Sequence, residues 1–110
     1  MKTINIGKEF SHHPAGRYYS DGPFSGQFFR EKYLWPDLEK NQSVTIELDD
    51  AEGYGSSFLE EAFGGLIRLE LMTHEQLLSR IAFVTEDEAL LEEVLAYVHE
   101  AVPGELGPPS

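Results

Sequence analysis

The chain has 110 residues without Cys, and its 8 Lys and Arg stand against 20 Asp and Glu, which gives a net charge of −12. A chain of this length builds one domain, and its 41% of hydrophobic residues can form a core without disulfides or Cys-ligated zinc. The negative charge repels phosphate backbones and anionic lipid, so we expect no nucleic-acid or membrane partner, and the lack of a long apolar segment or signal sequence predicts a cytoplasmic protein.

The first part of the chain is predicted to hold one strand and a long loop. Residues 3–6 alternate polar and apolar side chains, which is typical of a short strand. Turn-forming residues are frequent over 7–26, where we expect a loop with a short second strand over 16–20. A loop of this length is uncommon in a small domain and favours a binding surface.

A helix and the clearest strand follow this loop. Ser25 is suited to cap a helix over residues 26–40, whose aromatic and Leu side chains recur at helical spacing. Pro36 is expected to end or kink the helix, because it lacks the amide hydrogen and its ring clashes with the preceding turn. Residues 43–48 form a strand rich in β-branched side chains.

A second helix is predicted over residues 58–72. Its apolar positions cover a wider face than a surface helix needs, so we expect it to be largely buried. Gly64 and Gly65 each cost about 1 kcal/mol relative to Ala inside a helix. The pair therefore indicates that another segment approaches the helix backbone closely.

The last part of the chain predicts a strand over residues 80–85 and a helix from Thr85 or Glu86 to about Val102. We expect residues 103–110 to form a mobile tail, because they have no side chains that could pack.

Strands that alternate with helices predict an α/β fold, because parallel strands need crossover connections. We expect a single domain over residues 1–102, with a small mixed, mostly parallel sheet of about four strands packed with three helices. In such sheets the functional loops follow the carboxyl ends of strands, which makes the turn after Leu48 the first place to look for a site.

The segment after that strand has a specific sequence pattern. VTIELDD is followed by a Gly-containing turn and then by SSFLEEAFGGL, which together span Val44 to about Arg68. This pattern resembles the STAS domain of anti-sigma-factor antagonists and, more closely, a STAS-like family of unknown function. The resemblance is taken to extend over residues 1–102, and it implies a STAS-like fold and a regulatory role through protein contacts.

The Ser pair carries the functional part of the resemblance. In the antagonist proteins, a serine kinase of the histidine-kinase-like ATPase fold phosphorylates the first Ser of the pair, and the two proteins then no longer bind. Carried over by position, this implies Ser56 as the candidate phosphoacceptor and a histidine-kinase-like ATPase as the candidate partner. Gly55 and Phe58 stand where those proteins usually have Asp and Gly, so the chain departs from their pattern on both sides of the pair.

The residues themselves distinguish the two serines. Ser57 and Glu60 have the spacing of a capping box, in which each side chain accepts a hydrogen bond from the other residue's amide, so we assign them the role of helix cap. Ser56 lies just outside this box, and a phosphate there would add roughly −2 charges to the surface. A phosphoswitch, a constitutive binding surface and a purely structural loop all stay open at this point.

Further interaction candidates surround the same turn. Gly53 and Gly55 allow a sharp turn, but the Lys-Ser or Lys-Thr that follows in a phosphate-binding loop is missing. Tyr54 either projects outward as an anchor or packs over the helix, and Phe58 stands beside it in the candidate surface. In the long loop, Arg17 and Tyr18 are of the types that dominate contact hot spots.

Purely structural roles compete with these functional assignments. Arg17 could pair with Asp21 instead of contacting a partner. The pair at His12 and His13 has no third ligand at suitable spacing, so we predict no metal there. Asp49 and Asp50 follow Leu48 as an acidic pair. We assign them to caps or turns in preference to a cation site.

The sequence therefore favours a non-catalytic regulatory module that binds a protein through residues 54–57. No Ser lies in a G-x-S-x-G turn and no His is spaced to serve a nucleophile, so we predict no enzyme, no catalytic residues and no cofactor. The alternative is a small-molecule or nucleotide binder, or a weak enzyme, that uses the Gly-rich turn with Asp49 and Arg17. A third hypothesis pairs two copies through the aromatic residues of 26–38, and the oligomeric state is left open.

Overall fold

A computed structural model describes residues 2–107 of the chain. Its strands and helices are, in chain order, β1 (Lys2–Asn5), η1 (Ile6–Phe10), η2 (Tyr19–Asp21), α1 (Gly26–Phe29), η3 (Arg30–Leu34), α2 (Trp35–Glu39), β2 (Val44–Glu47), α3 (Ser56–Leu59), η4 (Glu60–Gly64), α4 (Gly65–Arg68), α5 (His74–Arg80), β3 (Ile81–Val84) and α6 (Glu88–Glu100). The alternation of strands and helices confirms the predicted α/β class.

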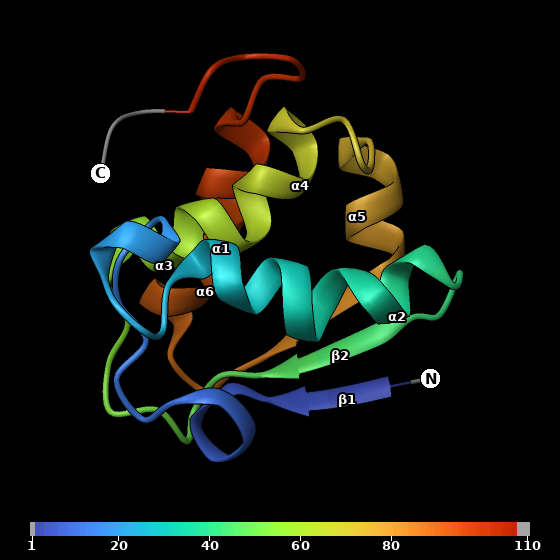
Figure 1. The fold of residues 1–110 in the computed structure, drawn as a ribbon. Helices are drawn as coiled ribbons and strands as arrows, with labels where there is room; N and C mark the ends of the chain where they lie inside the picture. The colour runs from blue at the N-terminus through green and yellow to red at the C-terminus, as the bar shows by residue number, and fades with distance from the viewer. Residues whose placement is uncertain (1, 108–110) are drawn as a thin grey trace.

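The described part of the chain contains one sheet of three parallel strands in the order β1-β2-β3. The register pairs Ile4 with Ile46 and Ile46 with Phe83. Both crossovers advance in the same direction, so right-handed connections place them on the same face of the sheet. Figure 1 shows the labelled helices α1 to α6 together on one side of β1 and β2. The other face leaves Ala82 and Val84 exposed.

This sheet is simpler than the sequence predicted. We expected about four strands in a mixed sheet, whereas the structure has three strands within residues 2–107 and all pairings are parallel. The short strand expected over 16–20 is absent from the described structure. Gly16 has a positive φ of 93°, and the 3₁₀ turn η2 begins at Tyr19, so this segment cannot extend as a strand.

Two continuous helices form the crossovers. Residues 26–39 (α1, η3 and α2) make up the first crossover helix, and residues 56–68 (α3, η4 and α4) make up the second; each has a π-helical turn in its middle. Ser25 caps the first helix as predicted, and its Oγ accepts a hydrogen bond from the amide of Phe28 at 3.1 Å. Pro36 does not end this helix, because it lies in the first turn of α2 directly after the π turn, where a missing amide hydrogen is tolerated.

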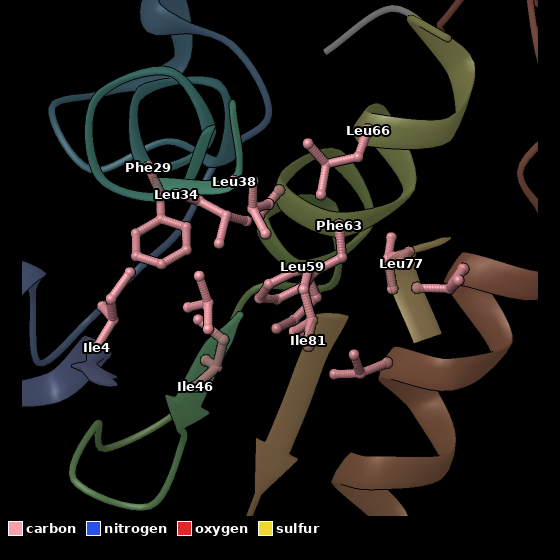
Figure 2. Packing of buried hydrophobic residues seen from close by; sticks show 14 of the residues in the cluster. Ile4, Phe29, Leu34, Leu38, Ile46, Leu59, Phe63, Leu66, Leu77 and Ile81 are labelled. Carbon is pink, nitrogen blue, oxygen red and sulfur yellow. The ribbon is translucent and has the colours of Figure 1, made fainter. Parts of the chain in front are cut away.

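The core lies between the crossover helices and the covered face of the sheet. Figure 2 shows Phe29, Leu34 and Leu38 of the first crossover helix and Leu59, Phe63 and Leu66 of the second directed toward Ile4, Ile46 and Ile81 of the strands. Every residue from 61 to 68 is buried, which confirms that the second crossover helix is largely enclosed. It begins at Ser56 and ends at Arg68, earlier than the predicted 58–72.

Aromatic side chains of the first crossover helix pack within the chain. The ring of Phe10 lies 5.0 to 5.9 Å, between centroids, from those of Phe24, Phe28, Phe29, Tyr33 and Phe58. Such edge-to-face contacts add to the stability of the core. The aromatic stripe proposed for pairing two copies is therefore used mostly inside one domain.

The C-terminal part contains a helix that the sequence did not predict, α5, and the predicted last helix, α6. The latter starts at Glu88, where Asp87 accepts a hydrogen bond from the amide of Leu90 at 3.0 Å. After α6, the amide of Gly104 donates to the carbonyl of Arg68 at 2.9 Å. The predicted mobile tail covers 103–110, of which residues 108–110 lie outside the described residues. Across residues 2–107, none of the helices has the length and apolar character needed to cross a bilayer.

Candidate functional site

The second crossover helix starts without a side-chain cap. Gly55 occupies the N-cap position, and among the described residues no side chain accepts from the first-turn amides. The predicted capping box of Ser57 and Glu60 is therefore wrong. Ser56 and Ser57 are the first two helical residues, and both are exposed. The candidate phosphoacceptor thus lies at the positive end of a helix dipole, open to solvent.

The carboxylate of Glu60 binds two arginines instead of a backbone amide, which explains the missing cap. Its Oε1 accepts from Arg17 and its Oε2 from Arg68. Burial opposes the ionised form of Glu60, but these bonds and charges outweigh it and hold the pKa below its usual value. Charge-assisted bonds to two guanidinium groups are stronger than the neutral cap that they replace.

Glu60 belongs to a buried ionic cluster of five side chains: Arg17, Arg30, Glu60, Glu61 and Arg68. Glu61 lies at the centre of this cluster and is 5% exposed. It accepts from Arg30 at 2.6 Å, from Arg68 at 2.8 Å and from Arg17 at 3.2 Å. The cluster holds three arginines and two glutamates, and Arg30 also pairs with the exposed Glu31 outside it at 3.7 Å.

The Gly pair of the second crossover helix makes room for this cluster. A Cβ at Gly65 would lie 2.5 Å from Arg30 Nη1, and a Cβ at Gly64 would lie 2.6 Å from a carboxylate oxygen of Glu60 and 3.3 Å from the carbonyl oxygen of Tyr97. Contacts this short exclude a side chain at Gly65 unless the guanidinium moves. The predicted close approach to the helix backbone is confirmed, and the approaching groups are Arg30 and α6.

Arg17 links the long loop to the helix start. Its backbone amide donates to Asp21 Oδ2 at 3.2 Å, whereas its side chain binds Glu60 and Glu61, so the expected side-chain pair with Asp21 is not formed. Desolvation opposes the charge of Arg17, but its bonds to the two glutamates outweigh this effect and raise its pKa. The side chain is 9% exposed and thus part of the interior.

Two of the expected contact residues are packed into the domain. Tyr54 donates its hydroxyl to the carbonyl of Leu48 at 2.6 Å, and its ring stacks on Phe58 with 6.1 Å between centroids. Burial raises the pKa of the Tyr54 hydroxyl well above its usual range. Phe58 is fully buried, so it cannot belong to a contact surface. Of the alternatives for Tyr54, the structure selects packing over the helix.

Four of the remaining candidates, Arg17, Gly55, Ser56 and Ser57, meet at one cavity beside the helix start. This cavity of about 320 Å³ is lined by Gly16, Arg17, Asp21, Gly55, Ser56 and Ser57, and we call it the Ser56 cavity. It joins two segments about forty residues apart in the chain, the long loop and the second crossover helix. Gly53 is exposed outside this cavity. Tyr18 lines a separate cavity with Arg30 and Arg68.

The side chain of Tyr97, from α6, interacts with the side chain of Ser56. Tyr97 donates its hydroxyl to Glu93 Oε2 at 2.6 Å. This bond, with burial, raises the pKa of Tyr97 to about 12, and a hydrogen bond from Ser56 opposes the rise. Ser56 is therefore the point at which the long loop, α6 and the second crossover helix meet.

A family model described as a STAS-like domain of unknown function (DUF4325) matches residues 25–90, which is more than half of the chain. The chain belongs to this family. No curated protein and no solved structure matches it. The matched segment of this STAS-like domain includes both crossover helices and the Ser pair, whereas Arg17 lies before it.

A third cavity of this STAS-like domain adjoins the Gly-rich turn. It measures about 400 Å³, and its lining includes the carboxylates of Asp49, Glu52, Asp87 and Glu93 but not Arg17. The structure therefore separates Asp49 from Arg17, and four carboxylates make this cavity unsuited to phosphate groups.

The acidic pair after β2 has structural roles. Asp49 accepts from the Thr85 hydroxyl at 2.5 Å and from the amide of Glu86 at 2.8 Å, and these bonds lower its pKa. Asp50 accepts from the side chain of Asn5 at 2.5 Å. Within residues 2–107, no three His, Asp or Glu side chains come close enough to hold a metal ion.

Sequence reasoning missed Arg30, Glu61 and Arg68 as members of a cluster. One signal was present: Glu61 and Arg68 lie in a helix predicted to be largely buried, and Arg30 lies in a predicted helix with an apolar stripe. Charged side chains are almost never fully buried without partners. These residues were therefore expected either to form ion pairs with one another or to lie at the surface.

Proposed function

We propose that this STAS-like domain is a non-catalytic regulatory module that binds a protein partner at the start of the second crossover helix, under the control of phosphorylation at Ser56. One observation carries the proposal. Ser56 and Ser57 are exposed beside the Ser56 cavity, in a first helical turn that no side chain of residues 2–107 caps. A kinase or a partner surface can reach this position without unfolding the domain.

The surroundings of Ser56 support a switch. A phosphate on Ser56 would lie at a helix N-terminus, where the dipole and the free amides favour negative charge. The nearby carboxylate of Glu60 is already neutralised by Arg17 and Arg68, so it opposes the phosphate less than its position in the sequence suggests. Adding roughly −2 charges to this exposed turn would change the surface that a partner meets.

The family resemblance and the charge of the chain guide the choice of partner. Anti-sigma-factor antagonists with a STAS domain bind a histidine-kinase-like ATPase through the matching helix start, and we propose a partner of this type here. A net charge of −12 suits a partner with a basic contact surface and predicts that binding weakens as salt rises.

The proposal is tested by comparing four forms of the protein as bait in a lysate of the native host. These are the wild type, Ser56→Ala, Ser56→Glu and Ser79→Glu. Ser79 is exposed on α5, which Figure 1 shows at the far side of the molecule from α3, so Ser79→Glu carries the same charge change away from the site. Each bait is also examined by mass spectrometry for phosphate on Ser56.

We expect one ATPase-type protein to be retained by the wild type, Ser56→Ala and Ser79→Glu, and lost with Ser56→Glu. Phosphate should appear at residue 56 of the wild type and not of Ser56→Ala. If Ser56→Glu and Ser79→Glu retain the same proteins as the wild type, the helix start is not the contact site and the proposal fails.

A further inference from the structure

The guanidinium of Arg17 uses only part of its hydrogen-bonding capacity. Its Nη1 donates to both Glu60 and Glu61. Its Nε is buried and has no acceptor, and Nη2 makes no hydrogen bond within the described residues either. Buried polar atoms of side chains are paired in the large majority of cases, so an unpaired Nε–Nη2 edge on a side chain that is 9% exposed calls for a partner.

This unpaired edge has a specific chemical preference. The Nε–H and one Nη2–H of a guanidinium point in parallel, and this fork matches two oxygens of a carboxylate or phosphate group. Arg17 is positioned by its two glutamate partners and by the bond from its amide to Asp21. A ligand would therefore meet a fork that is already oriented.

The Ser56 cavity, which Arg17 lines, supplies further groups that suit an oxyanion. Ser56 and Ser57 line its wall. The N-terminus of a helix that runs over residues 56–68 opens toward it, and Gly55 at the N-cap provides no side chain to occupy the amides. Amides and dipole at such an end favour negative charge.

The nearby acids do not close the site to an anion. Asp21, the one acidic residue in the wall, accepts at Oδ2 from the amides of Arg17 and Tyr18. Glu60 and Glu61 are bound by three arginines, and Arg30 Nη2 also lies 3.7 Å from Oε2 of the exposed Glu31, so neither glutamate of the cluster presents an unpaired negative charge to the cavity.

We infer that the Ser56 cavity of the unmodified protein is a binding site for an oxyanion, a phosphate or carboxylate group held by the Nε–Nη2 edge of Arg17 and by the uncapped start of the second crossover helix. The inference goes beyond the proposed function, because it concerns a ligand of the free domain and needs neither a partner nor a kinase. The same chemistry serves a free anion and an acidic group of a larger molecule. Separate titrations with phosphate and acetate show whether the site prefers a phosphate or a carboxylate group.

The test is a titration of ¹⁵N-labelled protein with sodium phosphate, followed by NMR at constant ionic strength. The Nε–H of Arg17 gives its own signal, and the amides of Ser57 and Phe58 report on the helix start. Sodium acetate replaces phosphate in a second titration, and sodium chloride serves as the salt control. Lys32→Gln removes one exposed positive charge elsewhere and is the matched control for charge.

Ser57→Asp is the second variant, because it places a carboxylate in the first turn without touching the buried ionic cluster. In the wild type and Lys32→Gln, we expect the signals of Arg17 Nε–H, Ser57 and Phe58 to shift together and saturate at millimolar phosphate or acetate. In Ser57→Asp, the Arg17 signal should start displaced and respond several-fold less. The inference is overturned if the Arg17 signal shows no saturating shift with either anion, or if Ser57→Asp titrates like the wild type.

Discussion

The sharpest prediction concerns Glu61, the centre of the buried ionic cluster. Glu61→Gln keeps the shape of the side chain but removes the negative charge that three guanidinium groups share. These groups donate hydrogen bonds to the Glu61 carboxylate, Arg30 at 2.6 Å, Arg68 at 2.8 Å and Arg17 at 3.2 Å. Glu61 is 5% exposed, so water cannot replace its carboxylate. Removing one partner of a buried ion pair costs about 3–5 kcal/mol, because the remaining charges stay buried without compensation.

This cost is measured as the change in the free energy of unfolding in urea. At about 4–8 °C per kcal/mol for a domain of this size, Glu61→Gln should also lower the melting temperature by roughly 12 °C or more. Glu75→Gln, on the exposed first turn of α5, is the matched control and should change stability by less than about 0.5 kcal/mol. A loss under about 1 kcal/mol for Glu61→Gln would refute the reasoning, since the guanidinium groups would then not depend on this charge.

Three further predictions address the cluster and its frame. Hydrogen bonds from guanidinium groups outweigh burial and hold the pKa of Glu60 in the folded state below its unfolded value of about 4.3. Glu60 therefore stabilises the fold above that pH and loses this effect as the pH falls. Glu60→Gln should make the melting temperature depend less on pH on the acid side. Gly65→Ala, whose Cβ would lie 2.5 Å from Arg30 Nη1, should cost about 1–3 kcal/mol in urea unfolding, whereas Gly53→Ala, with open space around it, should be nearly neutral. Ser25→Ala should cost about 1 kcal/mol by the same measurement, through loss of a helix cap.

Local patterns predicted most of the fold. The strands near residues 3–6, 43–48 and 80–85 and the cap at Ser25 follow from side-chain alternation and capping chemistry, which act between near neighbours. The helix α5 was missed although it begins with a readable signal. Thr73 and Gln76 form a capping box, in which Thr73 accepts from the Gln76 amide at 3.1 Å and Gln76 accepts from the Thr73 amide at 3.0 Å.

The candidate site could be predicted only in part, because its decisive contacts are distant in sequence. The Ser pair and the helix start were found from the strand–turn–helix pattern. Glu60 was assigned to a local cap. Its carboxylate instead accepts a charge-assisted hydrogen bond from Arg17, more than forty residues earlier in the chain, and this bond is stronger than the cap. No periodicity or spacing encodes a contact of this kind, so only the folded structure reveals that Arg17, Glu60 and Ser56 share one place.

The central claim is that a partner binds at the start of the second crossover helix, and hydrogen–deuterium exchange tests it most directly. The purified protein is exchanged alone and with the purified partner, and mass spectrometry follows peptides along the chain. We predict slower exchange over residues 53–61 and 15–19 on binding, and no such protection for Ser56→Glu at the same concentrations. Protection confined to other regions, such as the open face of the sheet around Ala82 and Val84, would contradict the account.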